Sequence, residues 1–274
     1  MYEYLTHTTN SPDSRVKMRD YCEKAIAIGI AEVAFTDHID HDPAGRTCGH
    51  NTYPAYMADI TARRNEFDGR LTIHAAAEVD WNRKTAPVVA AYLADKPFDF
   101  IICSVHWIDG EYLGVRATKQ PSIEVYRQYL DEIEVLVTTE DFFHVIGHFD
   151  LGKRSHTTNG RIDIEANRAQ LGRIFDAMAA RGKGFDLNTS AVRTAAREPM
   201  PGADILRLFR EHGGEHVTIG SDTHTLETFG TNIDVAVETL RAAGWTTVSH
   251  IEDGRLVQAP LESALMNARA AAIA

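Results

Sequence analysis

A carboxylate and an imidazole stand two residues apart near the end of the chain, in the run Ile219-Gly-Ser-Asp-Thr-His224. The apolar residues Val217 and Ile219 predict a buried strand that stops at Gly-Ser. In an extended backbone, positions i and i+2 point the same way, so Asp222 and His224 are expected side by side at the strand end. Such a pair suits a divalent metal ion, and a simple hydrogen-bonded Asp–His pair is the alternative.

Residues of the same kind recur where other apolar runs end. They are His7 after 2–5, His38 after 33–35, Glu78 at the end of 71–78, His106 after 98–105 and His148 after 142–147. The carboxyl ends of parallel strands share one face of a barrel, and active sites assemble there. We therefore expect histidine and carboxylate side chains from six strands to meet in one cleft, as a site for several metal ions.

Three further residues have two interpretations each. Asp13 is either the cap of a helix expected over 15–28 or a member of the metal site. Arg154 and Arg193 follow the fifth and sixth strand ends, where a guanidinium can bind two phosphate oxygens at once. The alternative for both arginines is surface pairing with the many acidic residues.

Strand-like and helix-like segments alternate along the chain. The expected strands cover 2–5, 33–35, 71–78, 98–105, 142–147, 184–187 and 217–219, and the helices cover 15–28, 53–67, 86–93, 123–137, 164–180 and 203–212. This alternation predicts a parallel sheet, and seven repeats favour one barrel over an open sheet. After a segment over 233–243, a tail over 246–258 and a last helix over 261–272 are expected to close the fold. We expect an α/β protein with residues 1–274 in one domain.

Composition excludes several classes of protein. The 274 residues are 44% hydrophobic and 24% charged, as in a globular protein. Neither a membrane-spanning run nor a signal peptide is found, and three scattered cysteines indicate reduced thiols, so a cytoplasmic location is expected. The net charge of −11 argues against a nucleic-acid partner. A homo-oligomer is compatible with the sequence.

Seven segments resemble the PHP (polymerase and histidinol phosphatase) superfamily, and within it the PHP-type histidinol-phosphatases. They are THTTNSPDS (6–14), FTDH (35–38), EVDW (78–81), FDFIICSVHWIDG (98–110), GHFDLGKR (147–154), FDLNTSAVR (185–193) and VTIGSDTH (217–224). The resemblance covers nearly the whole chain. It implies the PHP fold, a distorted TIM-like barrel of seven strands and seven helices.

The resemblance also implies two to three divalent or trivalent metal ions (Zn, Mn or Fe). It implies one metal held by His7, Glu78 and Asp222, a second by Glu78, His106 and His148, and a third by Asp13, His38 and His224. The family usually begins with His-x-His, whereas this chain reads Leu5-Thr6-His7. An apolar residue thus stands in place of a nitrogen ligand, which predicts a more open or weaker first metal position.

The activity implied by the resemblance is hydrolysis of L-histidinol phosphate to L-histidinol and phosphate, a step of histidine biosynthesis. Arg154 and Arg193 are expected at the free phosphate oxygens, with Arg193 also counted as catalytic. Asp222, His224 or a water molecule of the site is expected to protonate the leaving alcohol. An acidic or aromatic pocket is needed for the imidazole and amine, and its candidates are Asp80, Trp81, Trp107 and Asp109. Another small phosphate monoester, or a degenerate protein that only binds a phosphorylated ligand, is the alternative.

Overall fold

Seven parallel strands form a barrel in the computed structural model, which describes residues 1–43, 45, 47–50 and 52–265. In spatial order they are β1 (Tyr2–Thr6), β2 (Glu32–Phe35), β4 (Thr72–Asp80), β5 (Phe100–Ser104), β8 (Val145–Ile146), β9 (Gly184–Asn188) and β10 (Val217–Gly220). All paired neighbours in this order are parallel. This arrangement confirms the predicted α/β barrel.

The barrel closes between β1 and the residues that follow β10. The N–H of His7 donates to the carbonyl of Thr223 at 3.0 Å, and the N–H of Thr223 donates to the carbonyl of Leu5 at 3.2 Å. The register of β1 shifts between Glu3 and Thr6, and both Tyr4 and Leu5 join an apolar cluster with residues of β2, β4, β5 and β8. That cluster contains no helix residue, so it fills the inside of the barrel.

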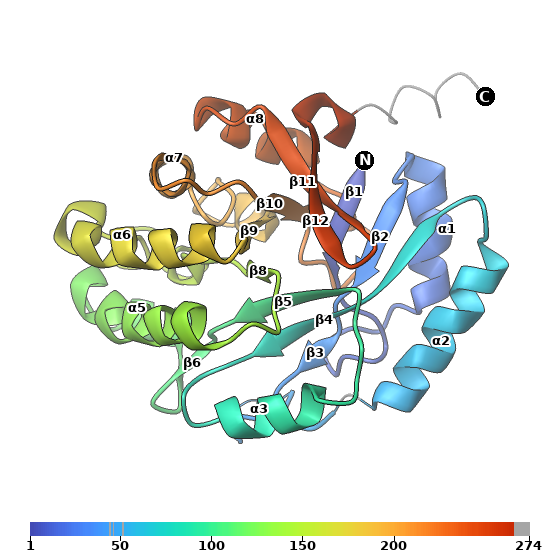
Figure 1. Ribbon diagram of the computed structural model, residues 1–274, viewed down its shortest axis with the longest axis horizontal. Coiled ribbons are helices and arrows are strands. Elements are labelled where there is room, and N and C mark those ends of the chain that lie inside the picture. Colours follow the sequence, from blue (N-terminus) through green and yellow to red (C-terminus); the bar gives the residue numbers. More distant parts are fainter. Residues whose placement is uncertain (44, 46, 51, 266–274) are drawn as a thin grey trace.

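Helices cover the outside of the barrel (Figure 1). They are α1 (Met18–Ile28), α2 (Tyr53–Glu66), α3 (Ala86–Leu93), α5 (Ser122–Thr139), α6 (Ile164–Ala180), α7 (Ala203–Glu211) and α8 (Ile233–Ala242), with a short α4 (Leu113–Ala117). Two 3₁₀ turns, η1 (Leu151–Arg154) and η2 (Ser190–Arg193), are the next elements after β8 and β9. Within the described ranges, no helix combines the length and apolar character needed to cross a bilayer.

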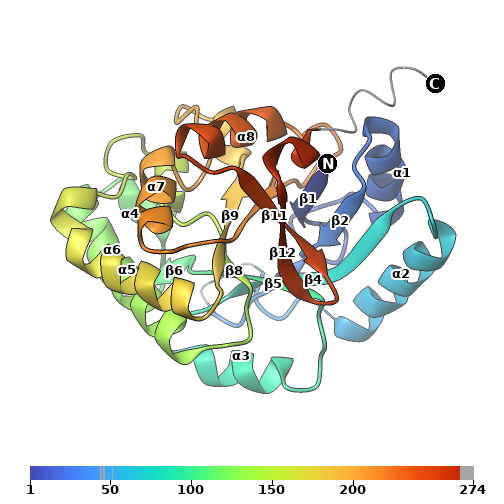
Figure 2. The same cartoon turned by 45° about the horizontal axis from the view of Figure 1, so that its top comes forward.

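Two antiparallel hairpins lie outside the barrel sheet. β6 (Trp107–Ile108) and β7 (Glu111–Tyr112) follow β5. β11 (Thr247–Glu252) and β12 (Arg255–Pro260) form the second hairpin, seen in red against the barrel in Figure 2. The carbonyl of Gly254 lies 3.1 Å from His144, just before β8, and Gln258 donates to the carbonyl of Glu215, just before β10. The second hairpin therefore covers the amino ends of the strands and leaves the carboxyl ends free.

Several predicted boundaries need correction. The expected strand over 142–147 reduces to Val145–Ile146, because the carbonyl of Phe143 accepts a hydrogen bond from the Lys183 ammonium at 2.7 Å instead of extending the ladder. The helix expected over 15–28 begins only at Met18. The tail over 246–258 forms the second hairpin. Of the last helix expected over 261–272, the described part is a 3₁₀ turn, η3 (Leu261–Ala264), and 266–272 lie outside the described residues.

A tyrosine hydroxyl joins the strands where β3 (His38–Ile39) begins. The β2–β4 ladder ends at Phe35–Ala75, and β3 pairs with β4 from Glu78 onward. In the gap, the Tyr56 hydroxyl donates to the carbonyl of Phe35 at 2.7 Å and accepts the N–H of Ala76 at 2.7 Å. Helix α2 thus supplies backbone partners at the point where the strand carrying His38 diverges from β2.

We predict that Tyr56→Phe lowers the free energy of unfolding by about 1–3 kcal/mol, because it leaves buried backbone groups without partners. Tyr53→Phe is the matched control in the same helix, since its hydroxyl makes an exposed hydrogen bond to the carbonyl of Pro97. The control should change the free energy by less than about 0.5 kcal/mol. Urea unfolding followed by circular dichroism measures both, and equal effects would contradict the prediction.

Candidate metal centre

The ionisable side chains predicted from the strand ends lie together at the carboxyl ends of the barrel strands. A cavity of about 390 Å³ is lined by Asp13, His38, Glu78, His106, His148, Arg154, Asp222 and His224. His7 is fully buried and lies 3.4 Å from Glu78 and 3.6 Å from Asp222. The structure therefore brings all eight predicted metal-site residues into one region.

Glu78 lies at the middle of this region and is only 1% exposed. Its Oε1 lies 2.8 Å from Nε2 of His148 and 3.5 Å from Nε2 of His106. Its Oε2 lies 3.4 Å from both His7 Nε2 and His38 Nδ1. Burial acts to raise the pKa of Glu78, but the surrounding histidines hold that pKa well below its usual range. Glu78 is therefore an anion shared among four imidazoles.

Three groups of side chains have ligand atoms close enough to share a cation. In each group these atoms lie within 4.8 Å of one another, and the groups are Glu78–His106–His148, His7–Asp13–His38–His224 and Asp40–Asp80–His106. The first group coincides with the second set implied by the family resemblance, and the second group contains the whole third set. The contacts of His7 with Glu78 and Asp222 connect the residues of the remaining set.

Asp13 joins the cluster and does not cap a helix. Helix α1 has Lys17 as its N-cap residue, without a side-chain cap. Asp13 Oδ2 instead lies 3.1 Å from Nε2 of His224 and 3.3 Å from Nε2 of His38. The capping interpretation was therefore wrong, because the loop after β1 ends well after Asp13 and turns it towards the strand ends.

The nitrogen atoms of the cluster fit a divalent cation. His7 Nε2 and His38 Nδ1 are buried and have no hydrogen-bond partner among the residues that the structure describes. Burial, together with the neighbouring His38 and His224, lowers the pKa of His7 to about 3, so its ring is neutral and has a free lone pair. A neutral imidazole nitrogen beside a carboxylate is the donor set that zinc and similar metals use.

His38 shows the need for a cation in another way. Burial opposes its charged form, but the hydrogen bond to Asp13 and the charge of Glu78 outweigh burial and raise the pKa of His38 to about 10. The carboxylates around this ring therefore hold a positive charge even without a metal. The same groups could hold a metal ion in place of that proton.

Asp80 orients one of the histidines. Its Oδ1 accepts the backbone N–H of His106 at 2.9 Å and lies 3.1 Å from His106 Nδ1. This contact leaves Nε2 of His106 facing Glu78 and His148, as in the carboxylate–histidine pairs of many metal sites. The sequence suggested Asp80 for the substrate pocket, whereas the structure places it against the ring of His106. Its position two residues after Glu78 on the same strand was the signal that it orients a metal-site histidine.

The two arginines differ in their surroundings. Arg154, at the end of η1, lines the cavity and donates to Oδ2 of Asp222 and to the Tyr112 hydroxyl, both at 2.8 Å. Arg193, at the end of η2, donates to the backbone carbonyl of Ser221 at 3.0 Å and to the Thr231 hydroxyl at 3.1 Å. Arg193 is not among the described residues that line the cavity, so its contact with phosphate stays a prediction.

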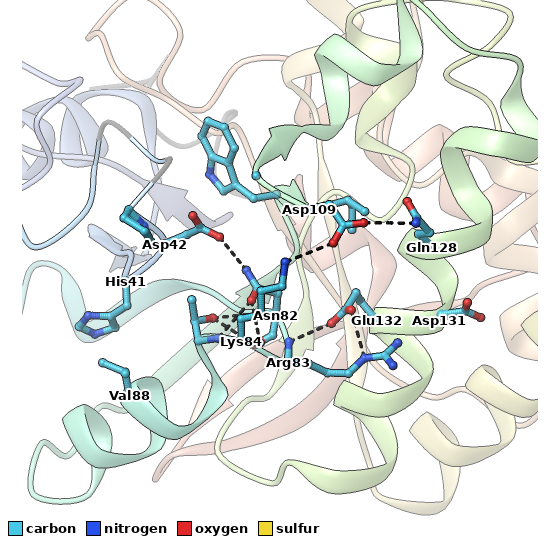
Figure 3. A pocket seen from close by; sticks show the side chains of 15 residues that line it. His41, Asp42, Asn82, Arg83, Lys84, Val88, Asp109, Gln128, Asp131 and Glu132 are labelled. Atoms are coloured by element: carbon cyan, nitrogen blue, oxygen red, sulfur yellow. Dashed lines mark hydrogen bonds and ion pairs between the residues drawn. The ribbon is translucent and has the colours of Figure 1, made fainter.

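The four candidates for the substrate pocket are dispersed. Trp107 lines the cavity, and Asp80 lies behind His106. Trp81 is 1% exposed and packs in the apolar core, so burial removes it from any pocket. Asp109 faces Lys84 in a neighbouring cavity of about 680 Å³ (Figure 3).

The predictions missed four residues that line the metal-site cavity, namely Asp40, Thr47, Tyr112 and Val115. Only Asp40 gave a signal, because it lies two residues after His38.

Known proteins are similar to this chain in sequence and in fold. The chain is similar to the histidinol-phosphatase of Lactococcus lactis subsp. lactis (28% identity, covering 89% of this chain and 91% of that protein). It is also similar to a protein named "Probable histidinol-phosphatase" in Deinococcus radiodurans (30% identity, covering 89% and 91%). The solved structure of histidinol phosphate phosphatase from Lactococcus lactis, complexed with Zn, L-histidinol and phosphate, matches with a TM-score of 0.82. That match has 25% identity and covers 93% of this chain and 98% of the other.

The family comparison agrees with these relatives. The model of the PHP domain matches residues 3–190, which is more than half of the chain and includes β1 to β9. With the barrel and the cluster around Glu78, this match shows that the chain belongs to the PHP family.

Proposed function

We propose that the protein is a metal-dependent phosphatase that hydrolyses L-histidinol phosphate to L-histidinol and phosphate. The observation that carries this proposal is the buried carboxylate of Glu78 among four histidines, beside the Asp222–Arg154 pair, in a cavity of small-molecule size. The relative with L-histidinol and phosphate in its structure supports the substrate. We further propose that residues 1–274 act as one domain, in the cytoplasm.

We propose that two to three ions of Zn, Mn or Fe are held by the three sets of residues named above. When bound, such ions lower the pKa of a water molecule towards ~7 and neutralise charge on phosphoryl oxygens. Leu5 cannot contribute a ligand to the set of His7, Glu78 and Asp222. Leu5 is fully buried inside the barrel. It packs so closely against Gly220 that a Cβ atom added to Gly220 would lie only 2.4 Å from the Cβ of Leu5. The first position therefore depends on His7 and two carboxylates.

The residues of the chain have separate tasks in this proposal. Arg154 binds free phosphate oxygens. Among the described residues that line the cavity, it is the only lysine or arginine. Asp222 accepts hydrogen bonds on Oδ2 from Arg154, Asn188 and Ser190, which favours its ionised form and leaves Oδ1 towards His7. His224 or a water molecule of the site then remains to protonate the leaving alcohol. Arg193 is proposed to position Asp222 through the carbonyls that it binds.

The experiment that tests this function is phosphate release from L-histidinol phosphate by protein stripped of metal and reloaded with Mn, Zn or Fe. We expect metal-dependent turnover with kcat/KM at least about tenfold above that on a generic aryl phosphate, since only the natural ester uses the whole cavity. Bound metal without any release of phosphate would contradict the proposal. Equal rates on both esters would indicate a different phosphate monoester as substrate.

We predict that Arg154→Gln lowers kcat/KM by about 100-fold, because a charge-assisted contact with the transferring phosphoryl group is lost. The metal content, measured by atomic emission, should not change. Arg173→Gln on the exposed face of α6 removes the same charge far from the site and should leave kcat/KM unaltered. Parallel losses in both variants would mean that overall charge, and not the phosphate contact, is responsible.

We predict that Glu78→Gln lowers the bound metal by at least one equivalent and activity by at least about 100-fold, since the amide keeps the shape but not the charge. Glu132→Gln is the control, because Glu132 is a carboxylate paired with Arg83 in the neighbouring cavity. Equilibrium dialysis with metal analysis reads the first effect directly. Full metal occupancy in Glu78→Gln would rule out a ligand role.

A further inference from the structure

Asp40 is a buried carboxylate that the proposed reaction does not use. It follows β3 directly, is 4% exposed and lines the metal-site cavity. Its Oδ2 accepts a hydrogen bond from the Thr47 hydroxyl, whereas its Oδ1 has no hydrogen-bond partner among the described residues. A buried carboxylate oxygen without a partner costs free energy, so this oxygen is suited to a donor or cation that binds in the cavity.

Asp40 faces a second carboxylate, Asp80, and the imidazoles of His38 and His106. Within the described part of the chain, Asp80 Oδ2 is also buried without a hydrogen-bond partner, and ligand atoms of Asp40, Asp80 and His106 lie within 4.8 Å of one another. Arg154 is the only lysine or arginine among the described lining residues, and it pairs with Asp222 and not with Asp40. With the imidazoles of His38 and His106 bound to metal ions instead of protons, the two carboxylates would be left to attract a positively charged group.

The distance from the metal cluster suits one part of the substrate. Nδ1 of His38 lies 3.4 Å from Glu78 Oε2 and 4.0 Å from Asp40 Oδ1. The carboxylates of Glu78 and Asp40 are therefore both close to this one nitrogen atom. In L-histidinol phosphate, two carbon atoms separate the ester oxygen from the ammonium nitrogen. A phosphate bound at the Glu78 cluster thus leaves the ammonium within reach of Asp40.

The neighbouring cavity provides a contrast (Figure 3). There Asp109 lies 3.2 Å from the Lys84 ammonium, and Glu132 lies 3.0 Å from the Arg83 guanidinium. Asp131, on the same wall, accepts a hydrogen bond from Gln170. Each of these carboxylates has a charged or amide donor, whereas Oδ1 of Asp40 has none among the residues that the structure describes.

We propose that Asp40, with Asp80 behind it, binds the ammonium group of a 1,2-amino alcohol phosphate ester and so makes the protein select substrates that carry an amine. This inference rests on the proposed function and adds the group that determines specificity. Asp40 acts on the part of the substrate that does not react, so its loss affects binding more than the chemical step.

The test compares two esters, L-histidinol phosphate and the same imidazolyl alcohol phosphate without the amine. We expect the wild-type protein to prefer the amine-bearing ester by roughly 10- to 100-fold in kcat/KM, and Asp40→Asn to lose most of that preference through a higher KM. Hydrolysis of the amine-free ester should stay within about threefold of wild type. Asp40→Glu, which keeps the charge, should retain part of the preference. Asp131→Asn removes a carboxylate from the neighbouring cavity and should keep all of it.

Each other outcome is also decisive. A full preference for the amine in Asp40→Asn overturns the proposal. Loss of one metal equivalent in that variant, with equal losses on both esters, would make Asp40 a metal ligand and also overturns it. If the wild-type protein hydrolyses neither ester, the proposed function fails, and calorimetry with L-histidinol then tests the subsite alone. Weaker binding of L-histidinol to Asp40→Asn supports the subsite, and equal or absent binding overturns it.

Discussion

The whole site depends on one buried anion, the carboxylate of Glu78. A carboxylate removed from water is stable only among compensating charges and hydrogen bonds, and here His7, His38, His106 and His148 surround it. These four rings come from or directly follow four different strands, which meet only because the barrel brings their carboxyl ends together. The fold is therefore the device that gathers distant histidines around a single charge.

Register explains how the inner and outer parts of the site are connected. β3 and β4 pair so that His38 lies beside Glu78, and both side chains face the cavity. Asp40 directly follows β3 and Asp80 is the last residue of β4, each two residues after its inner neighbour, so period-two alternation places both one step further along. The inner pair faces the proposed metals, and each residue of the outer pair has a buried carboxylate oxygen without a hydrogen-bond donor among the described residues.

Strand ends were predictable from the sequence because they depend on local patterns. Apolar runs followed by His106, His148 or Glu78 needed only strand periodicity and the geometry of a parallel barrel. The helices over 86–93 and 164–180 were also predicted at both ends. Asp13 and Arg193 were not resolved by such patterns, since their contacts depend on how a loop and a 3₁₀ turn fold back on other strands. Trp81 was misplaced because a strand-end position does not reveal which side of the sheet a large ring packs against.

The closing seam of the barrel has a consequence for the life of the protein in a cell. The first strand and the segment after the last one are joined by backbone hydrogen bonds at Thr223, and His7 and Asp222 lie on opposite sides of this seam. A metal ion held between these two side chains, as proposed, would also join the two ends of the sheet, because ligands that bind only the folded state stabilise it. Metal starvation would then lower the amount of protein as well as its activity, since chains whose seam opens more often are cleared sooner by proteases.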